Sequence, residues 1–401
     1  MGLLSSYLKR KNLVCFVIVF SFLGSISHSI AASTANWGGV ALSIQETTDD
    51  GSFPFARKML ACDPCAHGNI NEYARNKLVG KPYNNFELST AMVGVRQIEG
   101  VILSAIINRE SVQIYKETSG DRISYLHLYR FFVNLVAFEF KQGEARYVSS
   151  RPVVVQYTDY LDHPATPEEQ FEVAYNLYAN DTRGINIFDE LYKAGKSMKV
   201  DVFSEKYARV MPVILSDEVK SVMNLEELAL DDWRYQIGQI FEASLIKHSG
   251  GVLIPAASED STKADFSANF SNASFKIRLP EPTYTINLDV KRFVPVESIN
   301  GAQKTVCFIV GLQLTVDGPL EQLMDGKFIR KQDSCGVISV KDEVDPALRF
   351  PGSLFSLLNG ISKQFGNDVD QNFIKTSVLE NHKSVVDGIG AVKTAVFDPF
   401  N

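Results

Sequence analysis

The residues with the clearest chemical potential are two cysteines in the turn Cys62-Asp63-Pro64-Cys65. A C-x-P-C turn at a helix start is a thiol–disulfide redox motif, because the helix N-terminus lowers the pKa of the first thiol. This chemistry requires an apolar strand before the turn and a helix after it. The preceding segment, residues 53–61, is short and is interrupted by Pro54 and two cations, and the following residues lack a helical pattern. The sequence therefore favours a structural disulfide over a catalytic one.

The same two cysteines and His67 could begin a metal site. Zinc is bound in proteins by four ligands, most often nitrogen or sulfur atoms. No second cluster of cysteine and histidine exists in the sequence to complete the set. We therefore expect no metal and no other cofactor.

Cys307 and Cys335 lie on two expected strands, 305–316 and 327–340, on either side of the turn Asp317-Gly318-Pro319. If these strands pair antiparallel, residues whose numbers sum to about 642 face each other, and the two cysteines meet that condition. Without a signal peptide the chain keeps four cysteines, and an even number in an exported protein indicates two disulfides. Three pairings remain open; we expect the local one, Cys62 with Cys65 and Cys307 with Cys335.

Motifs of common hydrolases and dinucleotide-binding enzymes are missing from the sequence. It contains no G-x-S-x-G and no H-E-x-x-H, and Gly388-Ile389-Gly390 lacks the third glycine of a dinucleotide loop. The histidines beyond the N-terminal segment are widely separated: His67, His127, His163, His248 and His382. We interpret each as a structural or surface residue rather than a catalytic base.

The N-terminal segment has the layout of a secretory signal peptide. Lys9, Arg10 and Lys11 precede an apolar run over residues 13–23, and Ser29-Ile30-Ala31 fits the small-x-small pattern of a cleavage site. The apolar run is short for a membrane span, although an uncleaved anchor is the alternative. We expect residues 1–31 to be removed and the protein to be periplasmic or secreted.

Composition narrows the class of partner. The 401-residue chain has a net charge of −7, and loss of the three basic residues of the signal makes it more acidic. An acidic protein repels phosphate backbones, so nucleic acid is excluded as a partner. The 26 Phe and 15 Tyr residues are typical of sheets with large buried faces.

The first half of the chain predicts helices around a long hairpin. Apolar residues at three- and four-residue spacing predict a helix over 88–108, although the run from Val101 to Ile107 is β-branched. Residues 125–140 and 146–157 predict a β-hairpin whose first strand is covered on both faces. Pro152 indicates that the second strand either starts there or lies at an edge. Thr166-Pro167 predicts a helix start.

The second half predicts the same order of elements. A helix capped by Asp231 or Asp232 should end at Gly250-Gly251, followed by a short strand over 252–255 and an exposed loop over 256–275. Alternating apolar residues then predict strands at 284–290, 306–316 and 327–341, and a closing helix carries a stripe over 354–365.

These patterns predict an α+β protein of two domains, 32–220 and 221–401, each a mainly antiparallel sheet with long hairpins packed against flanking helices. The favoured function is an exported, non-enzymatic protein that binds a protein or envelope partner. The alternative is an exported thiol–disulfide oxidoreductase that uses Cys62 and Cys65. A third hypothesis, a secreted membrane-damaging protein, rests on the alternating strand at 284–290; membrane contact is not otherwise indicated.

Overall fold

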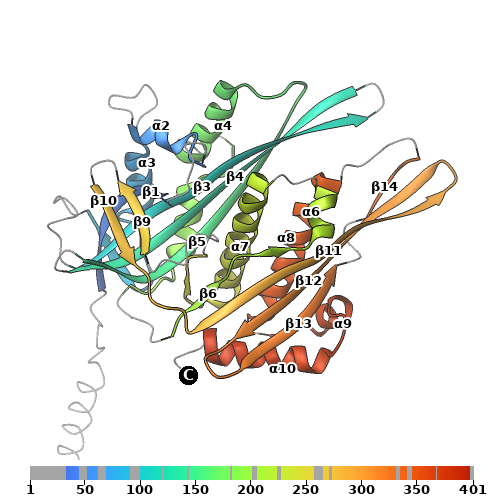
Figure 1. Ribbon diagram of the computed structural model, residues 1–401. Helices are drawn as coiled ribbons and strands as arrows, with labels where there is room; N and C mark the ends of the chain where they lie inside the picture. The colour runs from blue at the N-terminus through green and yellow to red at the C-terminus, as the bar shows by residue number, and fades with distance from the viewer. Residues whose placement is uncertain are drawn as a thin grey trace, which may run out of the picture. The chain divides into compact units, whose positions relative to one another are not determined.

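The computed structural model places helices against two sheets, which confirms the predicted α+β class (Figure 1). The structure describes residues 33–44, 52–61, 69–90, 100–119, 122–141, 144–180, 183–200, 206–223, 227–256, 265–270, 273–330, 335–340, 346–366 and 368–397. The signal-peptide prediction and the Cys62–Cys65 turn lie outside these ranges.

The first sheet has the strand order β2-β1-β3-β4-β5-β10-β9. Its strands are β1 (Ser33–Ile44), β2 (Phe86–Ser89), β3 (Gly100–Ser119), β4 (Arg122–Lys141), β5 (Glu144–Leu161), β9 (Asp265–Phe270) and β10 (Ala273–Arg278). Strands β3, β4 and β5 form an antiparallel meander that contains the predicted hairpin, with Phe140 facing Ala145 beside its turn. β1 pairs parallel to β3.

Central strand β4 is buried on both faces, as predicted. Phe131 and Val133 face one side and Phe132 and Val136 the other, and all four are at most 1% exposed. β5 pairs with β10 only at residues 145 and 146, so Pro152 occupies an edge position, where its missing N–H leaves no ladder hydrogen bond unmade.

The predicted helix over 88–108 is wrong: Leu88 belongs to β2, and residues 100–108 belong to β3. Because β3 is buried on both faces from Ile102 to Asn108, it lacks the apolar–polar alternation that identifies a half-buried strand. The β-branched residues of this segment were the better indicator.

Four helices pack on one face of the first sheet: α2 (Ala56–Ala61), α3 (Ile70–Leu78), α4 (Pro167–Ala179) and α5 (Ile187–Gly195). The start of α4 is confirmed, with a capping box between Thr166 and Glu169 and Pro167 in the first turn. In α3 and α5 an asparagine side chain caps the N-terminus, Asn69 and Asn186 respectively.

The second sheet has the order β13-β12-β11-β6-β8, with β14 paired to β12 and β7 paired to β11. Its strands are β6 (Ala208–Val210), β7 (Ile214–Leu215), β8 (Leu253–Ile254), β11 (Tyr284–Asn300), β12 (Gln303–Asp317), β13 (Gln322–Arg330) and β14 (Cys335–Ser339). The predicted strand over 327–341 is thus two strands, and each pairs with a different part of β12.

The remaining helices accompany the second sheet: α6 (Asp217–Met223), α7 (Glu227–Ser249), α8 (Pro346–Gln364), α9 (Gln371–Ser377), α10 (His382–Val392) and a π-helical turn, Lys393–Phe397. α7 ends at Gly250, whose φ of 70° is the left-handed conformation that ends many helices. Asp231 and Asp232 lie inside α7 rather than at its cap, because the helix begins at Glu227.

The two sheets exchange strands. β6 and β7 precede residue 221 yet join the second sheet, while β9 and β10 follow it and join the first. Where the structure describes the range 256–275 that was expected to be a loop, residues 265–270 and 273–275 belong to these two strands. The domain ranges 32–220 and 221–401 stay a prediction.

The two sheets have separate apolar cores. One core lies between the first sheet and α2–α5, and includes Phe131, Tyr178 and Phe188. The other lies between the second sheet and its helices, and includes Phe293, Phe328 and Leu357. A smaller cluster with Ile106 and Phe138 covers part of the other face of the first sheet. No helix in the described residues is long and apolar enough to cross a membrane.

Candidate partner-binding surface

Of the four cysteines predicted as disulfide partners, the structure describes two. Cys307 of β12 and Cys335 of β14 are bonded to each other. They face each other directly, in a register where paired residues sum to 642 from Gln303–Ser339 to Cys307–Cys335, as predicted. Cys62 and Cys65 lie outside the described residues, so their pairing and their redox role stay predictions.

The described histidines are held apart by different structural roles. His127 is fully buried and accepts a hydrogen bond from the Ala165 N–H at 2.8 Å. His163 is exposed beside Asp162 and Glu169, and hydrogen bonds to these carboxylates raise its pKa. His248 contacts Asn359 at 3.0 Å, and His382 contacts the Val378 carbonyl at 3.0 Å. In the described part of the chain no group of His, Cys, Asp or Glu residues could hold a metal.

Both sheets carry a hairpin end that we call an arm. Arm 1 comprises residues 113–119 of β3, 122–128 of β4 and 158–161 of β5. Arm 2 comprises residues 294–300 of β11, 303–309 of β12 and 335–340, which include β14. Figure 1 shows the β3–β4 and β11–β12 hairpins running past the helices that cover the rest of their sheets.

The arms concentrate the exposed apolar side chains. Of the ten large apolar side chains exposed in the described part of the chain, seven lie on the arms, at 40–65% exposure: Ile114, Ile123 and Tyr160 on arm 1, and Val296, Ile299, Val337 and Val340 on arm 2. Single exposed apolar residues are ordinary, but clusters of them mark interaction surfaces. Off the arms, Leu320 in the turn between β12 and β13 is the most exposed large apolar side chain of the described residues.

Strand register places several arm 2 residues on one face. Val296 faces Cys307, and Cys307 faces Cys335, so the three lie in one row across the arm. Val337 is two residues from Cys335 and therefore points to the same side. This face thus presents two valines and the disulfide. Ile299 is three residues from Val296 and points to the opposite side.

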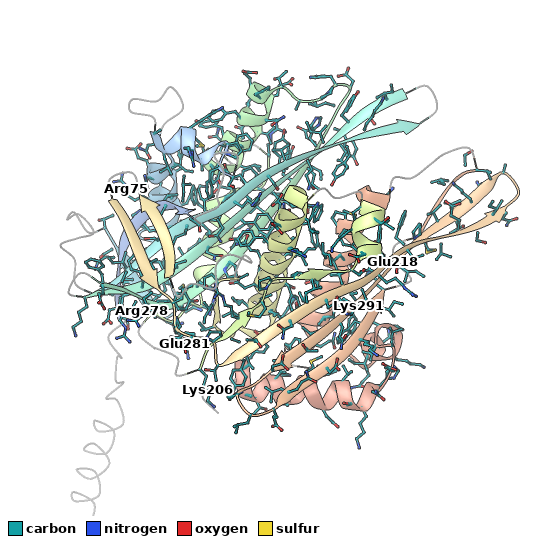
Figure 2. The ribbon with its side chains drawn as sticks, in the orientation of Figure 1. Arg75, Lys206, Glu218, Arg278, Glu281 and Lys291 are labelled. Carbon is teal, nitrogen blue, oxygen red and sulfur yellow. A yellow bond between two sulfur atoms is a disulfide. The ribbon has the colours of Figure 1, made fainter. Side chains whose placement is uncertain are left out.

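Several charged side chains lie at the root of arm 2. Figure 2 shows Glu218 on α6 and Lys291 on β11 near this root. Lys291 pairs with Asp289, and Arg292 Nε lies 3.8 Å from Glu218 Oε1. β11 pairs with β6 and β7 only up to Val290, so beyond this point it has β12 on one side alone. The arm is therefore an extension with little cover from the rest of the fold.

A surface groove lies between α2 and α4. It has a volume of about 590 Å³ and is lined by Lys58, Pro167, Glu168, Phe171, Glu172, Tyr175 and Asn176. Lys58 Nζ stands 5.6 Å from the centre of the Phe171 ring, and the hydroxyls of Tyr73 and Tyr175 are 3.1 Å apart. Burial raises the pKa of Tyr73 to about 12, so this hydroxyl keeps its proton. The groove can bind a ligand by ring contact, but a nucleophile beside a base is not among its lining residues.

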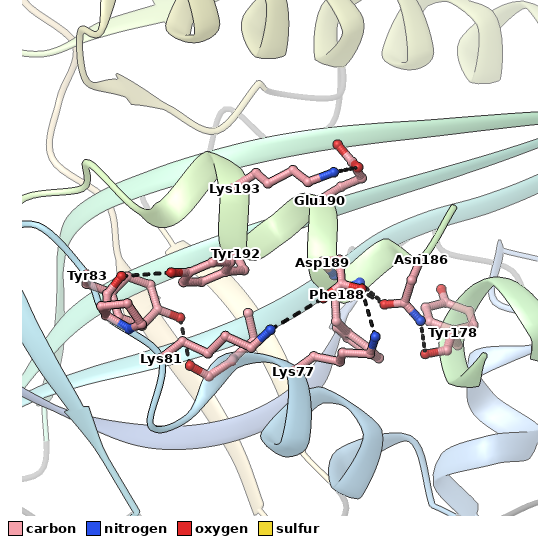
Figure 3. Close-up of polar contacts among 12 residues, drawn as sticks. Lys77, Lys81, Tyr83, Tyr178, Asn186, Phe188, Asp189, Glu190, Tyr192 and Lys193 are labelled. Atoms are coloured by element: carbon pink, nitrogen blue, oxygen red, sulfur yellow. Dashed lines mark hydrogen bonds and ion pairs between the residues drawn. The ribbon is translucent and has the colours of Figure 1, made fainter. Parts of the chain in front are cut away.

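Ion pairs tie the helices of the first sheet together near this groove. Asp189 of α5 accepts from Lys77 of α3 at 2.7 Å and lies 3.7 Å from Lys81 (Figure 3). Lys81 also stands over the Tyr192 ring, which packs edge-on against Tyr83. These contacts explain the packing of α3 on α5 and need no ligand.

Two buried carboxyls were not found by sequence reasoning. Glu110 of β3 accepts hydrogen bonds from the N–H groups of Phe55 and Ala56 and from the Tyr178 hydroxyl, and burial raises its pKa to about 7. Glu242 of α7 accepts from the Ala256 N–H at 2.8 Å, and burial raises its pKa to about 8. Glu110 lies in the polar run Asn108-Arg109-Glu110-Ser111 after an apolar segment, so the sequence offered little signal for its burial.

Comparison with known proteins leaves the family open. No family model and no curated protein sequence matches this chain. A solved structure of a Xanthomonas campestris protein of the DUF330 family is similar over 40% of this chain and 81% of that chain, with 11% sequence identity and a TM-score of 0.21. A likeness this low carries no inference about fold or function.

Proposed function

We propose that this chain is an exported, non-enzymatic protein that binds a protein or envelope component through arms 1 and 2. The observation that carries this proposal is the concentration of exposed apolar side chains on the two arms. Leaving such side chains in water costs about 1.5–3 kcal/mol each relative to burial. A partner that covers them recovers that free energy.

The composition of the arms favours a protein partner. The face of arm 2 that presents Val296 and Val337 also carries the neutral polar residues Ser298 and Thr305. It resembles the central part of protein–protein interfaces, in which charged residues are depleted. On arm 2 the ion pair between Lys304 and Glu297, at 3.3 Å, neutralises its two charges. The acidic net charge of the chain argues against phosphate-rich partners.

The Cys307–Cys335 disulfide supports export. It joins a half-buried cysteine to an exposed one on an arm that has few other contacts. Disulfides persist in oxidising compartments and are rare where cellular thiols keep cysteines reduced. An accessible disulfide of this kind fits the periplasm or the extracellular space.

The test is site-specific photocrosslinking of the full-length protein in the cells that make it. A photoreactive amino acid is placed at Val337 or Tyr160 on the arms, and at Leu320 as an exposed apolar control off the arms. We expect a discrete crosslinked partner from both arm positions and none from Leu320.

A second experiment, with variants that should lose the partner, complements the crosslinks. Val296→Ser with Val337→Ser should weaken recovery of the crosslinked partner at least tenfold, because two apolar contacts on one face of arm 2 are removed. Leu320→Ser should leave recovery unchanged. Equal recovery with the arm variant and the wild type would contradict the proposal, provided that circular dichroism shows both to be folded.

A further inference from the structure

Arg130 of β4 is the largest fully buried side chain in the described part of the chain. It lies on the face of the first sheet that turns away from α2–α5. Its Nη1 donates to Gln113 Oε1 of β3 at 2.9 Å and to Gln236 Oε1 of α7 at 3.2 Å, while Nε contacts Gln156 Oε1 of β5 at 3.4 Å. The guanidinium therefore joins three strands of the first sheet to the long helix of the second.

Two aromatic rings, on helices α7 and α8 of the second sheet, contact the guanidinium. The Arg130 Cζ atom is 5.3 Å from the centre of the Trp233 ring of α7 and 5.3 Å from that of the Phe355 ring of α8. Contacts of a guanidinium with aromatic rings gain strength when water is excluded. Arg130 is thus inserted between two helices that belong to the other core.

The surroundings of Arg130 offer little charge compensation. Its Nη2 has no hydrogen-bond partner, and among the described residues no carboxylate lies within ion-pair distance of it. The nearby Asp232 carboxylate is held by Arg109 Nε of β3 at 2.6 Å. A buried charge without a direct counter-ion is costly, and such groups are better explained by specificity of arrangement than by stability.

Aromatic contacts continue from Arg130 to the root of arm 2. Trp233 packs edge-on against Phe350 of α8, with ring centres 6.1 Å apart. Phe350 packs against Phe293 of β11 at 4.9 Å, and Phe293 stacks on Phe308 of β12 at 5.7 Å. Phe308 follows Cys307, the disulfide residue of arm 2. A close-packed chain of side chains thus connects β4, near the base of arm 1, with the base of arm 2.

We propose that Arg130 is a positioning residue that sets the orientation of arm 1 relative to arm 2. The two halves meet at an apolar cluster that contains Phe138 of β4 and Ile254 of β8, and nearer the arms they meet through the polar groups around Arg130. The contact on the arm side therefore depends on few specific groups. Interfaces of this type between parts of one chain permit relative motion unless a specific contact prevents it. The value of a set orientation for partner binding rests on the proposed function, whereas the orientation itself does not.

The test measures the distance between the arms in the isolated full-length protein. Fluorophores are attached through unnatural amino acids at Lys116 of arm 1 and Ser298 of arm 2, which are both exposed. The wild type should give one narrow distance distribution by single-molecule energy transfer. Arg130→Gln should at least double its width or add a second population.

Two further variants keep the result interpretable. Phe355→Leu removes one of the two aromatic rings that contact the guanidinium and leaves β4 unchanged. It should also broaden the distance distribution. Arg209→Gln is the matched control, because Arg209 is also a buried arginine but donates to Pro255 beside the neighbouring strand β8. It should leave the distribution unchanged.

An unchanged distribution in both Arg130→Gln and Phe355→Leu would overturn the inference. Equal broadening in Arg209→Gln would also overturn it, because any buried arginine would then have the same effect. No partner is present in this measurement, so its outcome is independent of the crosslinking result.

Discussion

Glu110 shows how a buried carboxyl is held in an apolar core. Its two oxygens accept from the backbone N–H groups at the start of α2 and from Tyr178, and these hydrogen bonds lower its pKa in part. Burial acts in the opposite direction and is the larger effect, so the pKa rises to about 7. The side chain therefore connects β3, α2 and α4, and the free energy that its burial costs rises when the carboxyl loses its proton.

We predict that stability falls as pH rises through this range. The folded protein keeps the Glu110 proton up to about pH 7, whereas the unfolded chain releases it near 4.5. The unfolded state then binds fewer protons, so the free energy of unfolding decreases between these values, by roughly 3 kcal/mol for this group. Urea unfolding at about pH 4.5 and about pH 7 measures the difference.

Glu110→Gln should reduce this pH dependence, because an amide can still accept from the backbone but does not titrate. The exposed Glu87→Gln, on β2, is the control and should leave the dependence as in the wild type. Glu242 adds a decrease of the same sign that extends to about pH 8 in all three proteins. The same slope in Glu110→Gln and wild type would refute the assignment to Glu110.

At the scale of elements, arm 2 is a three-stranded extension whose third strand, β14, has five residues. Such a short edge strand forms few ladder hydrogen bonds. The Cys307–Cys335 bond closes a loop of 28 residues across it. A cross-link of this length restricts the unfolded chain by about 3.5 kcal/mol in the chain-entropy model.

We predict that Cys307→Ser with Cys335→Ser lowers the free energy of unfolding by about 3 kcal/mol. Urea unfolding of the variant and of the oxidised wild type measures this loss. Peptide mapping of the wild type without reductant should recover the two cysteine peptides joined. A link from Cys307 to Cys62 or Cys65 would contradict the register of β12 and β14.

At the scale of the whole molecule, the two halves meet partly through the apolar cluster that contains Ile106, Phe138 and Ile254, and partly through a layer of polar side chains. Arg130 and Asn134 of the first sheet and Gln236 and Gln239 of α7 are buried in this layer, and Arg109 pairs there with Asp232. Apolar cores resist separation because opening them exposes large apolar areas, whereas a polar contact loses less on opening. The arms belong to different cores, so their relative position depends on this layer.

The last prediction concerns export of the protein from the cytoplasm. If residues 1–31 are a cleaved signal, N-terminal sequencing of the exported protein should begin near Ala32. Cytoplasmic protein that starts at Met1 would contradict export, and with it the compartment in which the Cys307–Cys335 disulfide is expected to persist.

The sequence by itself determined the features that depend on neighbours along the chain. The hairpin over 125–157, the α4 start at Thr166 and the end of α7 at Gly250 follow from turn and capping residues acting locally. The register that joins Cys307 to Cys335 also followed from a turn and two strand patterns.

Only the tertiary structure decided the features that depend on what covers a strand. Residues 100–108 form a strand because both faces are buried by groups distant in sequence, and this burial removes the alternation that would identify them. Val296 and Val337 show the opposite case, in which covering groups are absent from the fold around a strand. Their patterns match those of core strands, and they are exposed because, among the described residues, no helix or sheet packs over that face of arm 2.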